Sequence, residues 1–115
     1  MNQSTKDIGK EAEEWALKFL IELGYTLQKR NYRYKRSEID IIVQKGNTIV
    51  FVEVKFRKTT KFGHPEEFVS DNQKRSIVSG AEHFIAETNW QENIRFDIIA
   101  IDGQFNIEHF EDAFY

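Results

Sequence analysis

The residues that decide the fold are Ile49-Val50-Phe51-Val52-Glu53-Val54-Lys55-Phe56, an apolar run carrying two charges. Such a run is typical of a strand in a packed sheet. Upstream, residues 38–43 read Glu-Ile-Asp-Ile-Ile-Val and predict a second strand. Lys45-Gly46-Asn47 lies in the link between the two strands, and Gly and Asn tolerate the positive φ of a tight turn. The sequence therefore predicts a β-hairpin.

The charged residues of this hairpin share one face. Residues two apart in a strand point the same way, so Glu53 lies beside Lys55 on one strand. By the same rule Glu38 lies beside Asp40 on the other, and the intervening apolar residues point to the opposite side. If Gly46-Asn47 is a two-residue turn, Asp40 lies directly across from Glu53. An odd-length turn would break this register.

Two acids that face each other across strands repel, which an ordinary sheet avoids. A site for Mg²⁺ favours the arrangement, because this cation binds one or two carboxylates and completes its shell with water and phosphate oxygen. Lys55 is then placed to stabilise an attacking hydroxide or the charge that develops on phosphorus. In the alternative reading, Glu38 and Lys55 form a surface ion pair and the other acids are solvated. We expect a metal site built on Asp40, Glu53 and Lys55.

Helical patterns flank the hairpin on both sides. An N-cap at Asp7 and a stop at Gly24 bound the first predicted helix. Its apolar stripe consists of Ile8, Ala12, Trp15, Ala16, Phe19, Leu20 and Leu23. A second helix is predicted over residues 71–87, where Ser70 and Gln73 have the spacing of a capping box. Both helices are expected to pack on the sheet.

Three further extended segments complete the pattern. Residues 25–31 predict a strand or an extended lead-in, residues 94–101 a buried strand and residues 104–110 a last strand. The predicted order of elements is α-β-β-β-α-β, and residues 104–110 add one more strand after it. This order predicts an α/β fold in which helices flank a central mixed β-sheet, with residues 1–115 as a single domain.

Composition restricts the class of protein. The chain has 115 residues, of which 40% are hydrophobic, and it contains no cysteine. Disulfide frameworks, thiolate metal sites and cysteine nucleophiles are therefore excluded. The first ten residues contain no apolar signal region, and no apolar stretch approaches the roughly 18 residues of a membrane span. We expect a cytoplasmic protein that does not enter the membrane.

Basic residues gather in two runs although the net charge is −3. Residues 29–36 read Lys-Arg-Asn-Tyr-Arg-Tyr-Lys-Arg, and residues 55–61 contain four more basic residues and no acid. Such cations neutralise phosphates, and Tyr32 and Tyr34 could stack on unpaired bases. The alternative is a solvated loop with both tyrosines packed on the core. The predicted nucleic-acid-binding residues are Lys29, Arg30, Arg33, Lys35, Arg36, Arg57, Lys58, Lys61 and Gln73.

The remaining polar residues are interpreted without a special role. Gln73 is explained equally well as a capping residue. His64, His83 and His109 lack metal-ligand spacing and are expected to be ordinary surface or satisfied residues. The late acids are interpreted as surface charge rather than a second metal site. They are Asp97, Glu108, Glu111 and Asp112.

Asp40 followed by Glu53-Val54-Lys55 resembles the D…(D/E)xK signature of the PD-(D/E)xK nuclease superfamily. More narrowly, the chain resembles the small bacterial YraN-like proteins, for which a Holliday-junction-resolvase-like endonuclease fold is expected. The motifs that carry this resemblance extend along most of the sequence. They are Gly9-x-x-Ala12-Glu13-x-x-Ala16, Gly24-Tyr25, Arg30-Asn31-Tyr32-Arg33, Glu38-Ile39-Asp40-Ile41-Ile42, Val50-Phe51-Val52-Glu53-Val54-Lys55-x-Arg57, Phe62-Gly63-x-Pro65-Glu66-Glu67, Gln73-Lys74 and Arg95-Phe96-Asp97.

The resemblance implies a metal-dependent endonuclease that hydrolyses DNA phosphodiesters, at branched or structured sites, with Mg²⁺ or Mn²⁺. Junction-cleaving enzymes cut two strands, so the resemblance also implies a homodimer. The alternative is a nucleic-acid-binding or adaptor protein that kept the scaffold and lost catalysis. The implied site consists of the metal ligands Asp40, Glu53 and the carbonyl of Val54, the catalytic Lys55 and Glu13, and the accessory Glu38.

The sequence departs from the family pattern at two positions. Members usually have Gly where this chain has Ala12 and Ser37, which directly precede Glu13 and Glu38. Neither change removes an implied ligand. A serine at position 37 is bulkier than glycine, so it could alter the local backbone.

Overall fold

The computed structural model describes residues 5–58, 63 and 68–114, with side chains from residue 8 onward. The elements are α1 (Thr5–Glu22), β1 (Thr26–Tyr34), β2 (Ser37–Lys45), β3 (Thr48–Phe56), α2 (Asp71–Thr88), β4 (Asn93–Ile101) and β5 (Ile107–Phe110). The α/β prediction is confirmed. The first strand extends three residues beyond the predicted end at Asn31, to Tyr34. Within the described part of the chain, neither helix is both long and apolar enough to cross a membrane.

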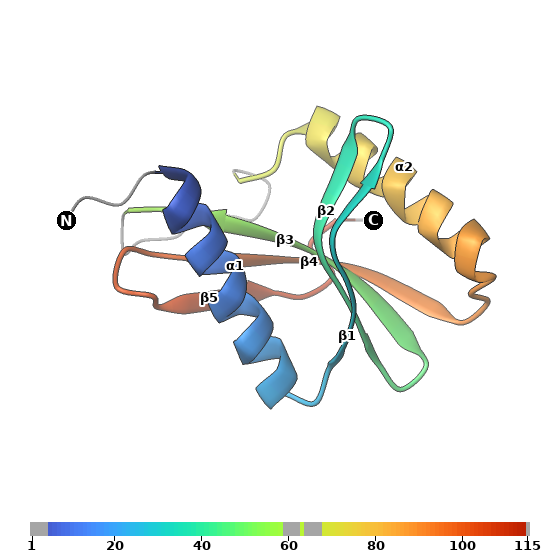
Figure 1. Cartoon of the computed structure of the whole chain (residues 1–115), viewed down its shortest axis with the longest axis horizontal. Coiled ribbons are helices and arrows are strands. Elements are labelled where there is room, and N and C mark those ends of the chain that lie inside the picture. Colours follow the sequence, from blue (N-terminus) through green and yellow to red (C-terminus); the bar gives the residue numbers. More distant parts are fainter. Residues whose placement is uncertain (1–4, 59–62, 64–67, 115) are drawn as a thin grey trace.

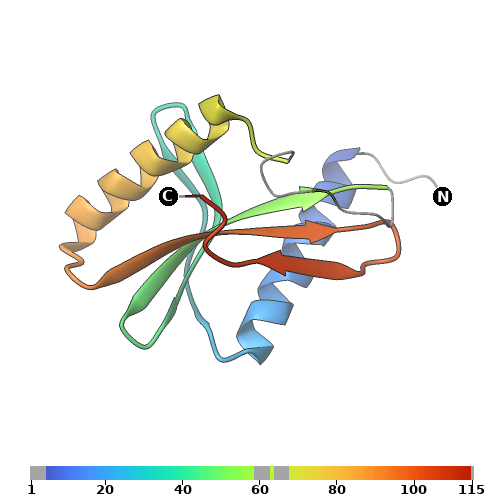
Figure 2. The same cartoon turned by 180° about the vertical axis from the view of Figure 1, so that it is seen from behind.

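A five-stranded mixed sheet forms the centre of the molecule (Figure 1). Its strand order is β1-β2-β3-β4-β5, and neighbours are antiparallel except for the parallel pair β3 and β4, which α2 connects. One apolar core lies between the sheet and α1, and the other lies between the sheet and α2. The view from behind in Figure 2 shows α1 on the far side of the sheet. The helices therefore cover opposite faces.

The predicted hairpin register is confirmed. Lys45 pairs with Thr48 across the two-residue turn Gly46-Asn47, and Gly46 has a φ of +60°. The β2–β3 ladder then runs to the pair of Ile41 with Val52, which puts Asp40 next in line with Glu53. Among the described pairs this ladder ends there, whereas β2 stays paired with β1 as far as Ser37. We call residues 32–39, the part beyond this separation, the hairpin arm.

The separation of β2 from β3 changes which side Ile39 faces. Strand alternation along β2 predicts that Ile39, Ile41 and Val43 face the same side of the sheet. This prediction is wrong for Ile39. Ile41 and Val43 pack in the core beneath α1, but Ile39 packs with Ile42 in the core beneath α2. Since β3 no longer constrains it, the arm turns toward α2 and brings Ile39 to the other side.

Helix α1 ends as the sequence predicts. Gly24 has a φ of +96°, the N–H of Tyr25 bonds to the carbonyl of Leu20 at 3.1 Å, and the N–H of Gly24 bonds to the carbonyl of Ile21 at 3.0 Å. This is a Schellman motif, which satisfies the last carbonyls of a helix. The start differs, because α1 begins at Thr5 and Asp7 is helical rather than an N-cap.

The buried stripe of α1 is narrower than predicted. Ala12, Ala16 and Leu20 are buried as expected, but Trp15 and Leu23 are 43% and 44% exposed. The buried set also includes Leu17, which the prediction omitted. A helix that covers only part of a twisted sheet buries about 100° of its circumference, and flanking apolar residues stay at the surface.

The capping box of α2 is confirmed. The Ser70 hydroxyl accepts a hydrogen bond from the N–H of Gln73 at 3.2 Å, and the Gln73 side chain accepts one from the N–H of Ser70 at 3.1 Å. These bonds fix the first turn of the helix. The arm lies against the following turns, because the Ser76 hydroxyl donates to that of Ser37 at 3.2 Å and Ser37 is buried.

Gly80 of α2 packs directly against the arm, and we expect Gly80→Ala to lower the free energy of unfolding. A Cβ at this position would lie 3.2 Å from the Cβ of Ser37 and 3.3 Å from Cδ1 of Ile39. Overpacking of this kind costs about 1–3 kcal/mol, which exceeds the gain in helix propensity of about 1 kcal/mol. Chemical denaturation measures the change. Ser79→Ala at the exposed neighbouring position is the control, and a Gly80→Ala variant as stable as that control would contradict the expectation.

Candidate metal and nucleic-acid site

A polar cavity of about 380 Å³ opens where β2 separates from β3. Helix α1 contributes one wall and the first turns of α2 contribute another, so all three layers of the fold meet there. The cavity brings together eight of the predicted site residues: Glu13, Arg36, Glu38, Asp40, Glu53, Val54, Lys55 and Gln73. Ser76 and Ile77 of α2 complete the lining.

Asp40 and Glu53 both line the cavity, one from each strand of the hairpin. The backbone N–H of Val54 donates to Oδ2 of Asp40 at 2.8 Å, which fixes the Asp40 side chain across the gap between the strands. Asp40 lies close enough to Glu53 to act on its carboxyl group by hydrogen bonding and by charge, and Lys55 lies close enough for its charge to act on Glu53. The hairpin thus places two carboxylates and a lysine together, as its register requires.

The cavity contains more acids than cations, because four carboxyl groups line it and only two basic side chains do. Burial raises the pKa of Glu53 to about 9, and the hydrogen bond and charge of Asp40 add to this effect, while Lys55 opposes it. Burial also raises the pKa of Glu13 to about 7, with the charges of Asp40 and Glu38 adding and Arg30 opposing. Carboxyl groups retain protons when their negative charges crowd together without enough cations. A divalent cation would relieve this crowding, so the donor set fits a metal site.

We expect Glu53→Gln to stabilise the metal-free protein at pH 8 by about 1–2 kcal/mol. The folded pKa of about 9 exceeds the ordinary 4.5, so the folded state binds more protons than the unfolded state between these values. Wild-type stability therefore falls as pH rises through this window, and glutamine avoids that loss. Thermal unfolding with and without Mg²⁺ is the measurement. Added Mg²⁺ should stabilise only the wild type, and a less stable metal-free Glu53→Gln at pH 8 would contradict the expectation.

Comparison with known proteins places the chain in a family. The model of the uncharacterised protein family UPF0102 matches residues 12–101. The chain belongs to this family. UPF0102 proteins of Christiangramia forsetii, Flavobacterium psychrophilum and Thermodesulfovibrio yellowstonii are 40%, 41% and 39% identical to it. Each alignment covers 95% of this chain and 94%, 94% and 96% of the relative, respectively.

Acids from other elements balance two of the arginines in the basic run of this UPF0102 protein. Arg30 forms an ion pair with Glu14 of α1 at 2.6 Å, and Arg33 forms one with Glu38 at 3.0 Å. The basic run contains no acid of its own, but β1 lies beside both α1 and β2, whose acids supply the balancing charge. Arg36 has no such partner among the described contacts and lines the cavity. The role of these residues in nucleic-acid binding stays a prediction.

The two tyrosines of the basic run have partners within the protein. Tyr32 packs edge-on against Phe84, and its hydroxyl bonds to Nδ1 of His83 at 2.7 Å. Tyr34 stacks on the His83 ring, with centroids 3.8 Å apart. The core-packing alternative is therefore correct for Tyr32. His83 is a satisfied residue, as predicted.

The other described residues of the predicted nucleic-acid-binding set are not among those that line the cavity. Lys29 and Lys58 are exposed. The Arg57 guanidinium lies 5.4 Å from the centre of the Phe68 ring, and its Nη1 donates to the carbonyl of Phe56 at 2.8 Å. Lys61 and His64 lie outside the described residues.

Asp97 was expected at the surface, and this expectation is wrong because its side chain is fully buried. Both of its oxygens accept from Arg95 at 2.8 Å, Oδ2 bonds to Nε2 of His109 at 2.7 Å, and Oδ1 accepts from the N–H of Asp112 at 3.0 Å. Asp97, His109 and Glu111 lie close enough to hold a metal ion. However, the Arg95 guanidinium already pairs with the carboxylates of Asp97 and Glu111, so we interpret the group as a structural ion-pair network.

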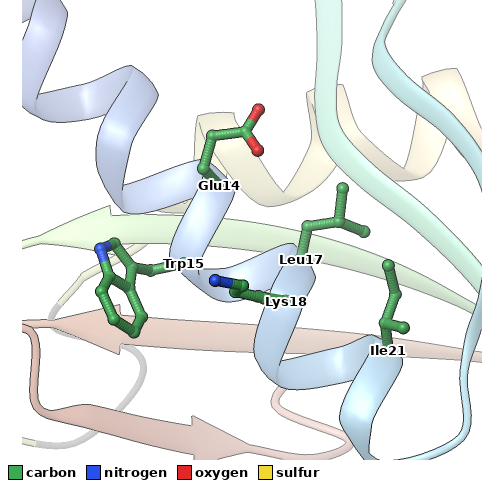
Figure 3. Close-up of a pocket in the computed structure, with 5 residues that line it drawn as sticks. All are labelled: Glu14, Trp15, Leu17, Lys18 and Ile21. Atoms are coloured by element: carbon green, nitrogen blue, oxygen red, sulfur yellow. The ribbon is translucent and has the colours of Figure 1, made fainter.

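A second cavity of about 310 Å³ lies on the outer side of α1 (Figure 3). It is lined by Glu14, Trp15, Leu17, Lys18 and Ile21. The Lys18 ammonium lies 5.7 Å from the Trp15 ring, and Trp15 and Ile21 are well exposed. This surface of the UPF0102 protein contains one carboxylate and no acid pair, so it does not compete with the polar cavity as a metal site.

Proposed function

We propose that this UPF0102 protein is a metal-dependent endonuclease that hydrolyses DNA phosphodiester bonds, at branched or otherwise structured sites. The observation that supports it best is the cavity in which Asp40, Glu53 and Lys55 meet Glu13 from the opposite helix. The proposal includes the PD-(D/E)xK assignment and a nuclease-like core. It also includes a cytoplasmic location and a homodimer.

The donor set of the cavity suits Mg²⁺ or Mn²⁺. Asp40, Glu53 and the backbone carbonyl of Val54 would hold the cation, since hard divalent ions prefer oxygen ligands and bind few carboxylates. The bound cation would supply Lewis acidity and neutralise negative charge at the scissile phosphate. The same cation would explain why the fold retains two carboxylates whose mutual repulsion otherwise costs stability.

Side chains of the protein would supply the rest of the chemistry, each with a different role. The Lys55 ammonium would stabilise the attacking hydroxide and the charge that develops on phosphorus. Glu13, with a pKa of about 7, can take up or release a proton near neutral pH. Arg36 and Gln73 line the same cavity from its rim and would position the phosphate.

The test is cleavage of labelled linear, single-stranded, flapped and four-way-junction DNA in Mg²⁺ or Mn²⁺ and in chelator, with wild type and Asp40→Asn. The expected result is cutting that requires the cation and is lost in Asp40→Asn, with the preferred substrate identified by its rate. Salt-sensitive binding by both proteins without cutting of any substrate would contradict the proposal. It would instead support a binding or adaptor protein on this scaffold.

A further inference from the structure

Glu38 belongs to two environments at once. It lines the polar cavity, two residues from Asp40 on the same strand. It also lies opposite Arg33 in the β1–β2 ladder, where Nε and Nη2 of Arg33 both donate to its Oε2 at 3.2 and 3.0 Å. The arm therefore presents a carboxylate to the cavity and, on the adjacent strand, a guanidinium that holds it.

The pair of Arg33 and Glu38 can be exchanged readily. The two side chains are 77% and 41% exposed, and ion pairs in such positions contribute little to stability. A guanidinium binds phosphate in the same two-pronged geometry as carboxylate, so a phosphate can take the place of Glu38. Glu38 also acts on the cavity electrostatically, since its charge contributes to the raised pKa of Glu13.

We propose that Arg33 is a positioning residue that holds Glu38 away from the cation. When a phosphate replaces Glu38 as the partner of the Arg33 guanidinium, Glu38 joins Asp40 and Glu53 as a third carboxylate at the cation. This inference rests on the proposed function. Without substrate, Arg33 competes with the cation for Glu38 and the cation binds weakly. When the nucleic-acid backbone binds the arm, the released carboxylate strengthens cation binding beside the phosphate to be cut. Because linkage is reciprocal, the cation strengthens nucleic-acid binding by the same factor.

The chain supplies a matched control for this inference. Arg30 also lies on β1 and pairs with a carboxylate, that of Glu14. Glu14, however, is 62% exposed and lines the outer cavity of α1 instead of the polar cavity. Arg30→Gln therefore removes the same charge from the same strand and releases an acid that does not line the polar cavity. Because the charge of Arg30 acts on Glu13 of the cavity, this variant measures the general effect of losing a positive charge.

The test is the affinity of the whole chain for Mn²⁺ alone, without nucleic acid, measured by calorimetry at pH 8. We expect Arg33→Gln to bind Mn²⁺ about fivefold more tightly than wild type, because it removes the competition for Glu38. Arg30→Gln should change the affinity less than twofold. In the Glu38→Gln background the Arg33→Gln effect should vanish, and Arg33→Lys, which cannot form both hydrogen bonds, should lie between wild type and Arg33→Gln.

The outcomes separate this inference from the proposed function. Equal gains in Arg33→Gln and Arg30→Gln would show a general effect of charge and overturn the role of Arg33. Persistence of the Arg33→Gln effect without the Glu38 carboxylate would overturn the role of Glu38. If Asp40→Asn binds Mn²⁺ as wild type does, the metal site itself is wrong and both proposals are overturned. Asp40-dependent binding with no change in Arg33→Gln overturns only the present inference.

Discussion

Lys55→Ala is expected to lower the rate of DNA cleavage by about 100- to 1000-fold while Mn²⁺ binds at least as tightly as in wild type. Lys55 lies beside Glu53 in the cavity, and its charge already acts on that carboxyl group. Removing an ammonium next to the carboxylates leaves the cation ligands in place and removes a competing positive charge. What is lost is stabilisation of charge that develops only during the reaction. Single-turnover cleavage at saturating Mn²⁺, with calorimetry of Mn²⁺ binding, measures both quantities.

Two further variants serve as controls for this experiment. Lys55→Arg keeps the charge but changes its shape and reach, so partial activity is expected if the charge near phosphorus is what counts. Lys18→Ala removes a lysine on the outer side of α1, beside Trp15, and should leave the rate unchanged. A Lys55→Ala rate within threefold of wild type would contradict the role of Lys55 as stabiliser of the reaction. A loss of Mn²⁺ binding in that variant would indicate a structural role instead.

Asp97→Asn is expected to lower the free energy of unfolding by about 3 kcal/mol. The buried carboxylate accepts hydrogen bonds from Arg95 and from the backbone N–H of Asp112 and bonds to His109, and an amide cannot replace all of these. Burial by itself would raise the pKa of Asp97, but these hydrogen bonds outweigh it and hold the pKa below its ordinary value. The folded state therefore binds fewer protons than the unfolded state, and the contribution to stability is present above about pH 4 and lost as pH falls through the folded pKa. Denaturant unfolding from pH 3 to 7 is the measurement.

The control for this prediction lies in the same network. Glu111 contacts Arg95 at 3.4 Å, but its side chain is 59% exposed, so Glu111→Gln should cost less than about 1 kcal/mol. The stability of the wild type should also fall more steeply below pH 4 than that of Asp97→Asn. Equal effects of the two substitutions would contradict the interpretation that burial makes this network important to the fold.

Local chemistry explains why the hairpin could be predicted. Gly46-Asn47 fixes the loop length, and strand alternation then fixes which residues face each other. The relation of Asp40 to Glu53 follows from these two facts, and the capping box of Ser70 and Gln73 is equally local. Features that depend on residues close together in the chain could thus be predicted from the sequence. The grouping of Asp40 and Glu53 on the hairpin is one of these features.

Contacts between distant segments explain what could not be predicted. The face of Ile39 depends on where β2 leaves β3, and nothing near Ile39 in the sequence marks that point. Arg33 reaches Glu38 because β1 continues to Tyr34, beyond the predicted end of the strand. Asp97 resembles a surface acid until Arg95, His109 and the chain near Asp112 close around it. The sequence contained one signal of this network: Arg95 and Asp97 are two residues apart on a strand, so their side chains point the same way.

Strand β1 also bears on how the protein behaves at high concentration. It forms one border of the sheet over nine residues, so the outer side of its backbone can pair with a strand of another molecule. Charged side chains such as Lys29, Arg30 and Arg33 along a border strand oppose that pairing and keep molecules apart in solution. Replacing all three with neutral residues is therefore expected to promote self-association and insoluble assemblies. Light scattering of such variants would distinguish this colloidal effect from a loss of phosphate contacts.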